Sequence, residues 1–253
     1  MKKIFALLSL TTAMFVSAAQ TTTLLIAGWD FQTTTTGGTA VLASPATPKV
    51  YVANFGSGTL YLDGSEGSSD WFVPATGSTD TQLNAFAGSN VNTAGTGFST
   101  TTTSPAALVV VGGASNAANG KAAVFKFSMT GFQDLVISLS AQRTSTGFAT
   151  QAWEYSTDGT TYTSIGSLVG GSTAGTIRNS FTNSDTLTLP TVTGFNNAAN
   201  AYVRVTFTGA TASAGNNRLD NIQFNAVPAV PEPSCAILIG LGGIGLIVRR
   251  RRQ

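Results

Sequence analysis

Apolar residues between Gln20 and Pro228 recur in short runs with a period of two, and no stretch of useful length shows the 3.6-residue period of a helix. Glycine, asparagine, aspartate, serine and threonine separate these runs, and such residues favour turns. Only 9% of the residues are charged and 28 are glycine, a composition unlike that of an ordinary cytosolic enzyme. The pattern therefore predicts an all-β fold, with a single β-sandwich formed by residues 20–228.

Several runs predict particular strands of this sandwich. The odd-numbered residues of 135–142 and of 201–208 are apolar, so we expect them to face the core and the even-numbered residues to face solvent. Asp158-Gly159 lies between the runs 148–156 and 161–168 and predicts a tight hairpin turn, because the glycine supplies a positive φ. Residues 24–31 and 218–224 have the pattern of the first and last strands, and we expect them to pair or to lie as neighbours.

The N-terminus has the three parts of a secretion signal. Lys2 and Lys3 precede an apolar stretch over residues 4–16, and Ser17-Ala18-Ala19 supplies the small residues of a cleavage site. We therefore predict a signal peptide over residues 1–19 that is cleaved after Ala19. A buried N-terminal helix is the alternative interpretation.

The C-terminus carries three features in succession. A glutamate between two prolines, Pro231-Glu232-Pro233, comes first, and an apolar, glycine-rich run over residues 235–248 follows. The third is a basic cluster formed by Arg249, Arg250, Arg251 and Arg252. As a helix the apolar run is about 21 Å long, short of the roughly 30 Å hydrocarbon core. We predict a short transmembrane helix over residues 234–248 in a locally thinned bilayer. The arginines resist translocation, which keeps the C-terminus in the cytoplasm and the body outside.

Residues 229–253 resemble the PEP-CTERM sorting signal of exopolysaccharide-producing bacteria. The resemblance is carried by Pro231-Glu232-Pro233, the apolar helix and the terminal arginines. This tail is also labelled an ice-binding protein C-terminal domain, a name that describes no activity. The resemblance implies that an exosortase, a transpeptidase-like membrane enzyme, cleaves the membrane-anchored precursor near Pro-Glu-Pro and passes the body to the cell surface or extracellular matrix. A plain membrane anchor is the alternative.

Three segments of the body, 29–31, 155–162 and 218–222, resemble the jelly-roll sandwiches of secreted bacterial proteins and carbohydrate-binding modules. The resemblance implies a jelly-roll-like sandwich and makes exopolysaccharide a candidate partner.

Residues 20–228 hold seven of the 13 basic and ten of the 11 acidic residues, a net charge of about −3. Nucleic-acid binding needs clustered cations, so we expect no nucleic-acid partner.

The residue inventory excludes several kinds of catalytic and metal site. The chain has no histidine and its single cysteine, Cys235, lies in the tail, which excludes Ser-His-Asp and Cys-His catalysis and zinc sites built on His or Cys. A glycoside-acting enzyme would need two carboxylates about 5 to 9.5 Å apart across a cleft. We expect a non-catalytic body without a resident cofactor, and a glycoside-acting enzyme is the weaker alternative.

Two acidic positions are candidates for a structural Ca²⁺. Asp63, Glu66 and Asp70 share one glycine-serine loop, but their spacing misses the EF-hand pattern and a solvated loop is the favoured interpretation. The resemblance to jelly rolls implies that Asp220, on the last strand, could hold calcium. The alternative is an aspartate that hydrogen-bonds a neighbouring loop.

Aromatic residues supply the candidates for a sugar-binding surface. Trp153 and Tyr155 share one face of the predicted strand 148–156, and aromatic rings stack on the apolar faces of sugars. These two residues would form a polysaccharide-binding surface if that face is exposed, whereas interior packing is the favoured alternative. The sequence thus predicts an exported, sorted surface or matrix protein with a structural or adhesive sandwich, and a polysaccharide-binding module is the alternative.

Overall fold

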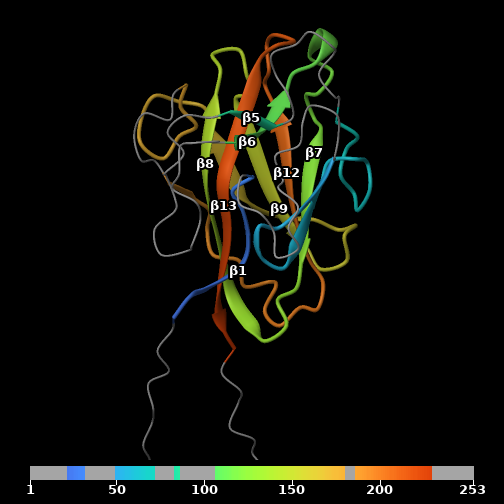
Figure 1. Ribbon diagram of the computed structural model, residues 1–253, viewed down its shortest axis with the longest axis vertical. Coiled ribbons are helices and arrows are strands. Elements are labelled where there is room, and N and C mark those ends of the chain that lie inside the picture. The colour runs from blue at the N-terminus through green and yellow to red at the C-terminus, as the bar shows by residue number, and fades with distance from the viewer. Residues whose placement is uncertain (1–21, 32–48, 72–82, 86–105, 180–185, 230–253) are drawn as a thin grey trace, which may run out of the picture. The chain divides into compact units, whose positions relative to one another are not determined.

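The computed structural model describes residues 22–31, 49–71, 83–85, 106–179 and 186–229, and residues 23–229 form one compact unit (Figure 1). The signal peptide and the transmembrane helix predicted for residues 1–19 and 234–248 lie outside the described residues. Within the described ranges the unit consists of antiparallel strands and one short 3-10 turn, η1 (Ala114–Asn116). The prediction of an all-β body is confirmed.

The strands form two sheets. The seven-stranded sheet has the order β11 (Leu187–Thr188), β8 (Phe132–Arg143), β13 (Asn216–Pro228), β1 (Leu24–Trp29) and β3 (Phe55–Gly56), with β6 (Ala106–Val111) beside β13 and β5 (Leu83–Ala85) beside β6. The six-stranded sheet has the order β10 (Thr163–Val169), β9 (Thr150–Ser156), β12 (Ala201–Thr208), β7 (Ala122–Phe127), β4 (Gly58–Tyr61) and β2 (Val50–Val52).

The first and last strands pair, as the sequence predicted. β1 runs antiparallel to β13, with Leu24 opposite Ala226 and Trp29 opposite Ile222. β13 also pairs along its length with β8, and its first residues pair with β6 (Figure 1). The last strand of the body is therefore a central strand of its sheet.

Aromatic side chains from both sheets meet in the interior. Trp29 of β1 lies 5.0 Å from Phe125 of β7, and Phe224 of β13 lies 4.8 Å from Phe127 of β7, as measured between ring centroids. The Trp29 indole N–H donates to the backbone carbonyl of Tyr51 at 3.1 Å, which satisfies its buried donor. These edge-to-face contacts pack the two sheets face to face as a β-sandwich.

The predicted core faces of β8 and β12 are correct, but the prediction that the other face of β8 meets solvent is wrong in its middle. The odd-numbered residues of 135–141 and 201–207 are all buried. Ser138 and Ser140 are buried as well, with 8% and 0% of their surface exposed. The alternation of residue types distinguishes the two faces of a strand, yet it does not reveal that both are covered.

The β9–β10 hairpin forms as the Asp-Gly turn predicted. Thr163 pairs with Tyr155 across the two strands, and Gly159 adopts a φ of +74°. The Asp158 carboxylate accepts hydrogen bonds from the backbone N–H groups of Thr160 at 2.7 Å and Thr161 at 2.8 Å. Asp158 is therefore explained by the turn that it stabilises.

Candidate functional site

The structure places Trp153 and Tyr155 against the core, so they do not form an exposed platform. The Trp153 side chain is 0% exposed and its ring stacks on Phe125, with the centroids 6.1 Å apart and an interplanar angle of 13°. Tyr155 packs edge-on against Phe195 at 5.1 Å. The face that both residues share is the interior face of β9, the interpretation that the sequence favoured over a sugar-stacking surface.

Asp220 is fully buried on β13. Its Oδ1 accepts a hydrogen bond from the backbone N–H of Asn221 at 2.7 Å, and Asn221 itself adopts a φ of +48° beside an irregularity in the strand. No group of three or more acidic, histidine or cysteine residues gathers as a metal site in the part of the chain that the structure describes.

The sorting residues fall outside the described part of the chain. These are Ala19 at the predicted signal cleavage site, Pro231, Glu232 and Pro233, and Arg249, Arg250, Arg251 and Arg252. Among the described residues, no helix is long and apolar enough to cross a membrane.

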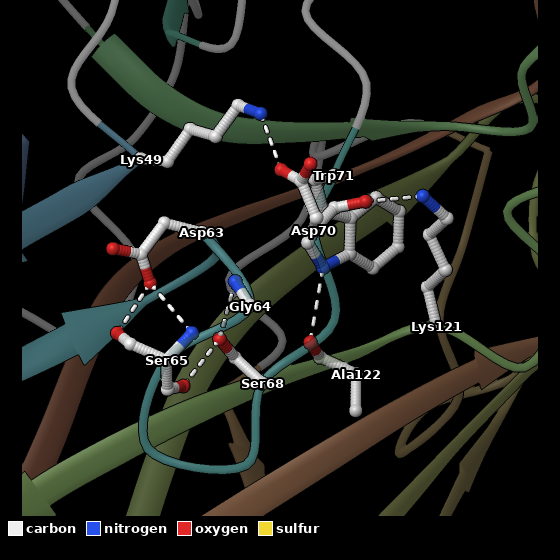
Figure 2. Close-up of polar contacts among 9 residues, drawn as sticks. All are labelled: Lys49, Asp63, Gly64, Ser65, Ser68, Asp70, Trp71, Lys121 and Ala122. Carbon is white, nitrogen blue, oxygen red and sulfur yellow. Dashed lines mark hydrogen bonds and ion pairs between the residues drawn. The ribbon is translucent and has the colours of Figure 1, made fainter.

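The three acids of the glycine-serine loop are engaged within the protein. Figure 2 shows this loop, residues 63–71, which we call the pinned loop. Asp63 accepts hydrogen bonds from the Ser65 backbone N–H and hydroxyl, and the hydroxyl contact lowers the pKa of Asp63 below its usual value. Asp70 pairs with Lys49, while Lys121 reaches the Asp70 backbone carbonyl from the other side (Figure 2).

Two hydrogen bonds to one backbone carbonyl of β7 fix the far end of the pinned loop. The Ser69 N–H and the Trp71 indole N–H both donate to the Ala122 carbonyl, at 2.8 and 3.1 Å. The third acid, Glu66, pairs with Lys126 at 2.9 Å. Lysines pair with two of the three carboxylates, so the loop is held by contacts within the protein.

Around Lys126, the outer face of the six-stranded sheet carries a group of contacts that we call the tyrosine–cation cluster, formed by Glu66, Lys126, Glu154, Tyr162, Tyr202 and Arg204. Sheet register brings them together, because Arg204 lies opposite Glu154 on β9 and Tyr202 lies opposite Lys126 on β7. All six side chains are at least partly screened from solvent.

In this cluster each cation meets both a carboxylate and a ring. The Arg204 guanidinium donates through Nε and Nη2 to Glu154 Oε2, at 2.9 and 2.7 Å, and lies 3.8 Å from the Tyr162 ring centroid. Lys126 Nζ lies 5.4 Å from the Tyr202 ring centroid, and its hydrogen bond to Glu66 raises the pKa of Lys126. Such cation–π contacts add to the ion pairs where water is partly excluded.

Two turns close over the same face. A Cβ placed on Gly159 would lie 3.3 Å from the Tyr202 ring, so the hairpin turn rests directly on that ring. A Cβ on Gly67 would meet the Gly159 carbonyl at 3.4 Å and the Tyr162 hydroxyl at 3.5 Å, which places the pinned loop beside the hairpin turn. The cluster therefore fastens two loops to the sheet.

Sequence reasoning did not identify the tyrosine–cation cluster. The even-numbered residues of 201–208 were predicted to face outward, and Tyr202 and Arg204 do lie on that face. Their partners come from three other segments, so only strand order and register reveal the cluster. The one local signal was a tyrosine and an arginine two positions apart on a polar strand face.

Comparisons with known proteins give one specific match. Residues 229–252 match the PEP-CTERM protein-sorting motif. Among solved structures, the chain is similar to the K2 cleaved adhesin domain of Lys-gingipain, with a TM-score of 0.37 and 11% identity over 78% of this chain and 96% of that one. A likeness at that level carries no argument about function, and no curated protein matches the chain. The chain thus carries a PEP-CTERM sorting signal, which implies export, processing by exosortase and a membrane-anchored precursor that reaches the cell surface.

Proposed function

We propose that this protein is an exosortase-sorted component of the cell surface or extracellular matrix, and that its sandwich has a non-catalytic structural or adhesive role. The sorting motif at residues 229–252 carries the proposal, because it begins directly after the last strand of a closed sandwich. Cleavage near Pro231 would release the folded body complete, since the strands of the sandwich end at Pro228.

Fractionation and intact mass of the native protein test the sorting step. We expect the wild-type protein to begin at Gln20, to lack the tail and to appear at the surface or in the matrix. A variant with Pro231, Glu232 and Pro233 changed to alanine should stay uncut in the membrane. If both proteins keep the tail and remain in the membrane, the C-terminus is a plain anchor and the proposal of exosortase processing is wrong.

Internal pairing of charges supports the non-catalytic role. Glu154 is committed to Arg204 and Glu66 to Lys126, so neither carboxylate is free to act as a general acid or base in this arrangement. We expect the body to release no reducing sugar from the polysaccharides of its own cells. Release that disappears in a Glu154→Gln variant would favour the glycoside-acting alternative.

Polysaccharide binding is the second candidate function. Its support is the outer face of the six-stranded sheet, where Tyr61 and Tyr162 are partly exposed and Tyr162 lies against the Arg204 guanidinium. If this face binds polysaccharide, a column of immobilised exopolysaccharide should retain the wild-type body but not a Tyr61→Ala, Tyr162→Ala variant. A Thr208→Ala variant, changed at an exposed position on β12 of the same sheet, is the control. Equal elution of all three would favour a purely structural role.

A jelly-roll-like connectivity and a structural calcium ion belong to the same proposal. The chain passes repeatedly between the sheets, from β8 to β9, from β10 to β11, and from β12 to β13, which supports the jelly-roll assignment.

For calcium at Asp220 we expect the thermal midpoint of the body to fall on addition of EGTA and to recover with Ca²⁺. An unchanged midpoint would contradict a structural calcium ion.

A further inference from the structure

Two amide side chains lie inside the sandwich at the end where β8 passes to β9. Gln151 is 0% exposed and sits between Phe207 of β12 and Leu168 of β10, its partners across the strands. Asn217 is 0% exposed and lies on the core face of β13, opposite Val110 of β6. We call Gln151 and Asn217 the amide pair, one member coming from each sheet.

Arg143 joins the two sides of this region. Arg143 belongs to β8 and lies opposite Asn217 of β13. Its side chain reaches across to the end of β10, where a Cβ placed on Gly170 would lie 2.1 Å from Arg143 Nη1. Gly170 follows Val169, whose strand neighbour Leu168 lies opposite Gln151. The guanidinium of Arg143 therefore approaches the sheet that carries Gln151.

A short segment, Ile177 and Arg178, connects the two sheets at this point through backbone hydrogen bonds. The Ile177 N–H donates to the Val169 carbonyl at 2.8 Å, and the Arg143 N–H donates to the Arg178 carbonyl at 2.9 Å. Ile177 is fully buried. The segment thus bonds to both sheets, to β10 through Ile177 and to β8 through Arg178.

Several polar atoms in this region have no hydrogen-bond partner among the residues that the structure describes. These are both amide atoms of Gln151, both amide atoms of Asn217, and Nε of Arg143. Arg143 Nη2, in contrast, donates to the carbonyls of Ser145 at 3.0 Å and Gly147 at 3.3 Å. Buried polar groups are paired in nearly all folded proteins, so these unpaired atoms at the same end of the sandwich point to a bound polar species.

We propose that ordered water occupies this end of the core and bridges the amide pair and Nε of Arg143. The region offers amide oxygens that need donors and N–H groups that need acceptors, and water serves both. A metal ion would find no carboxylate among these groups. An anion would accept from the N–H groups but would leave both amide oxygens unpaired.

Unfolding of the purified full-length chain in urea tests the proposal, because it shows whether each substitution lowers or raises the urea midpoint. We compare the wild-type protein with Gln151→Leu, Asn217→Leu and the double variant, and use Asn200→Leu, an exposed position before β12, as the control. Each single variant should lower the urea midpoint by about 0.5 M or more, because the bridging water loses a partner and the other amide stays unpaired. The double variant should lose less than the sum, and the control should stay near wild type.

Water ¹⁷O relaxation dispersion supplies a second measurement that needs no variant to fold. We expect a signal from long-lived internal water in the wild-type protein and a weaker signal in the double variant. Single variants with raised midpoints would overturn the proposal, because they would show that the amides are buried without water. A wild-type protein without the dispersion signal, or the same signal in the double variant, would also overturn it. So would a midpoint that rises with anion concentration in the wild type but not in Arg143→Leu, since it would identify an anion.

Discussion

At the scale of single residues, the clearest electrostatic device is the Asp158 carboxylate of the β9–β10 turn. Hydrogen bonds from the backbone N–H groups of Thr161 and Thr160 and from the Ser156 hydroxyl lower its pKa well below the usual range. A carboxyl whose pKa is lower in the folded state stabilises the fold above its unfolded pKa of about 3.9 and loses this contribution as the pH falls toward the folded pKa.

We therefore expect Asp158→Asn to be less stable than wild type above about pH 5 and the difference to shrink steadily below about pH 4. The amide keeps one acceptor oxygen for the turn but carries no charge. Urea midpoints measured from pH 2 to pH 7 check this expectation, and Asp134→Asn serves as the control. A difference that stays constant across that range would show that charge contributes nothing to the turn.

Trp153 gives a residue-scale test of the interior packing of β9. Its ring is buried and stacked on Phe125. We expect Trp153→Ala to cost about 3 to 5 kcal/mol of unfolding free energy, as for other large aromatic residues removed from a core. Equilibrium unfolding in urea measures this value. A loss below about 1 kcal/mol would place the ring at the surface instead.

The sequence placed Trp153 and Tyr155 on the same strand face and favoured interior packing over an exposed sugar-binding surface, and the structure packs that face against the core. Alternation with a period of two groups the residues that share a face but does not itself say which face is covered. In β12 the odd positions are uniformly apolar, so the core face was evident, whereas in β9 the face that carries Trp153 and Tyr155 also carries Gln151. Buried Gln151 makes the interior face of β9 look still less like a core face.

At the scale of elements, the passage from β8 to β9 depends on close backbone packing at Gly147. A Cβ on Gly147 would lie 2.1 Å from the Asn216 carbonyl oxygen, although this glycine has an ordinary negative φ. Its N–H donates to the Thr144 carbonyl at 3.0 Å, which turns the chain from one sheet toward the other. The absence of a side chain is therefore required by space rather than by backbone conformation.

We expect Gly147→Ala to lower the unfolding free energy by about 1 to 3 kcal/mol, because the added methyl group must displace backbone atoms of β13. Gly131→Ala is the matched comparison, since Gly131 has a φ of +78° and open space around it. That variant should show only the smaller cost of a left-handed alanine. Equal losses in the two variants, measured in urea, would mean that steric contact with Asn216 is unimportant.

The elements that could be predicted are those that local chemistry specifies. The Asp158-Gly159 hairpin, the alternation in β12 and the pairing of the terminal strands were all apparent before the structure. The tyrosine–cation cluster was not, because Lys126, Tyr162 and Arg204 come from separate strands and turns. Their proximity follows from the order β10, β9, β12, β7 in the sheet, which no single segment encodes.

At the scale of the whole molecule, the last strand connects folding to sorting. β13 pairs with β8, β6 and β1, and after its end at Pro228 the Ala229 N–H still donates to the Gly131 carbonyl at 2.8 Å. The described fold therefore continues to within two positions of Pro231 in the sequence. A cut at the sorting motif leaves β13 intact, whereas a cut only a few residues earlier would remove core residues from it.

Two truncations of the mature chain, both beginning at Gln20, test this dependence. A chain that ends at Ala229 should keep a cooperative thermal transition with Tm within about 2 °C of the full-length protein. A chain that ends at Asn221 loses Ile222, Phe224 and Ala226, which are fully buried, and the pairing with β1. It should therefore lack the cooperative transition and the near-ultraviolet circular dichroism of the packed aromatic core. If the shorter chain melts with the same Tm as the longer one, the sandwich closes without the end of β13, and the site of sorting cleavage is not constrained by the fold.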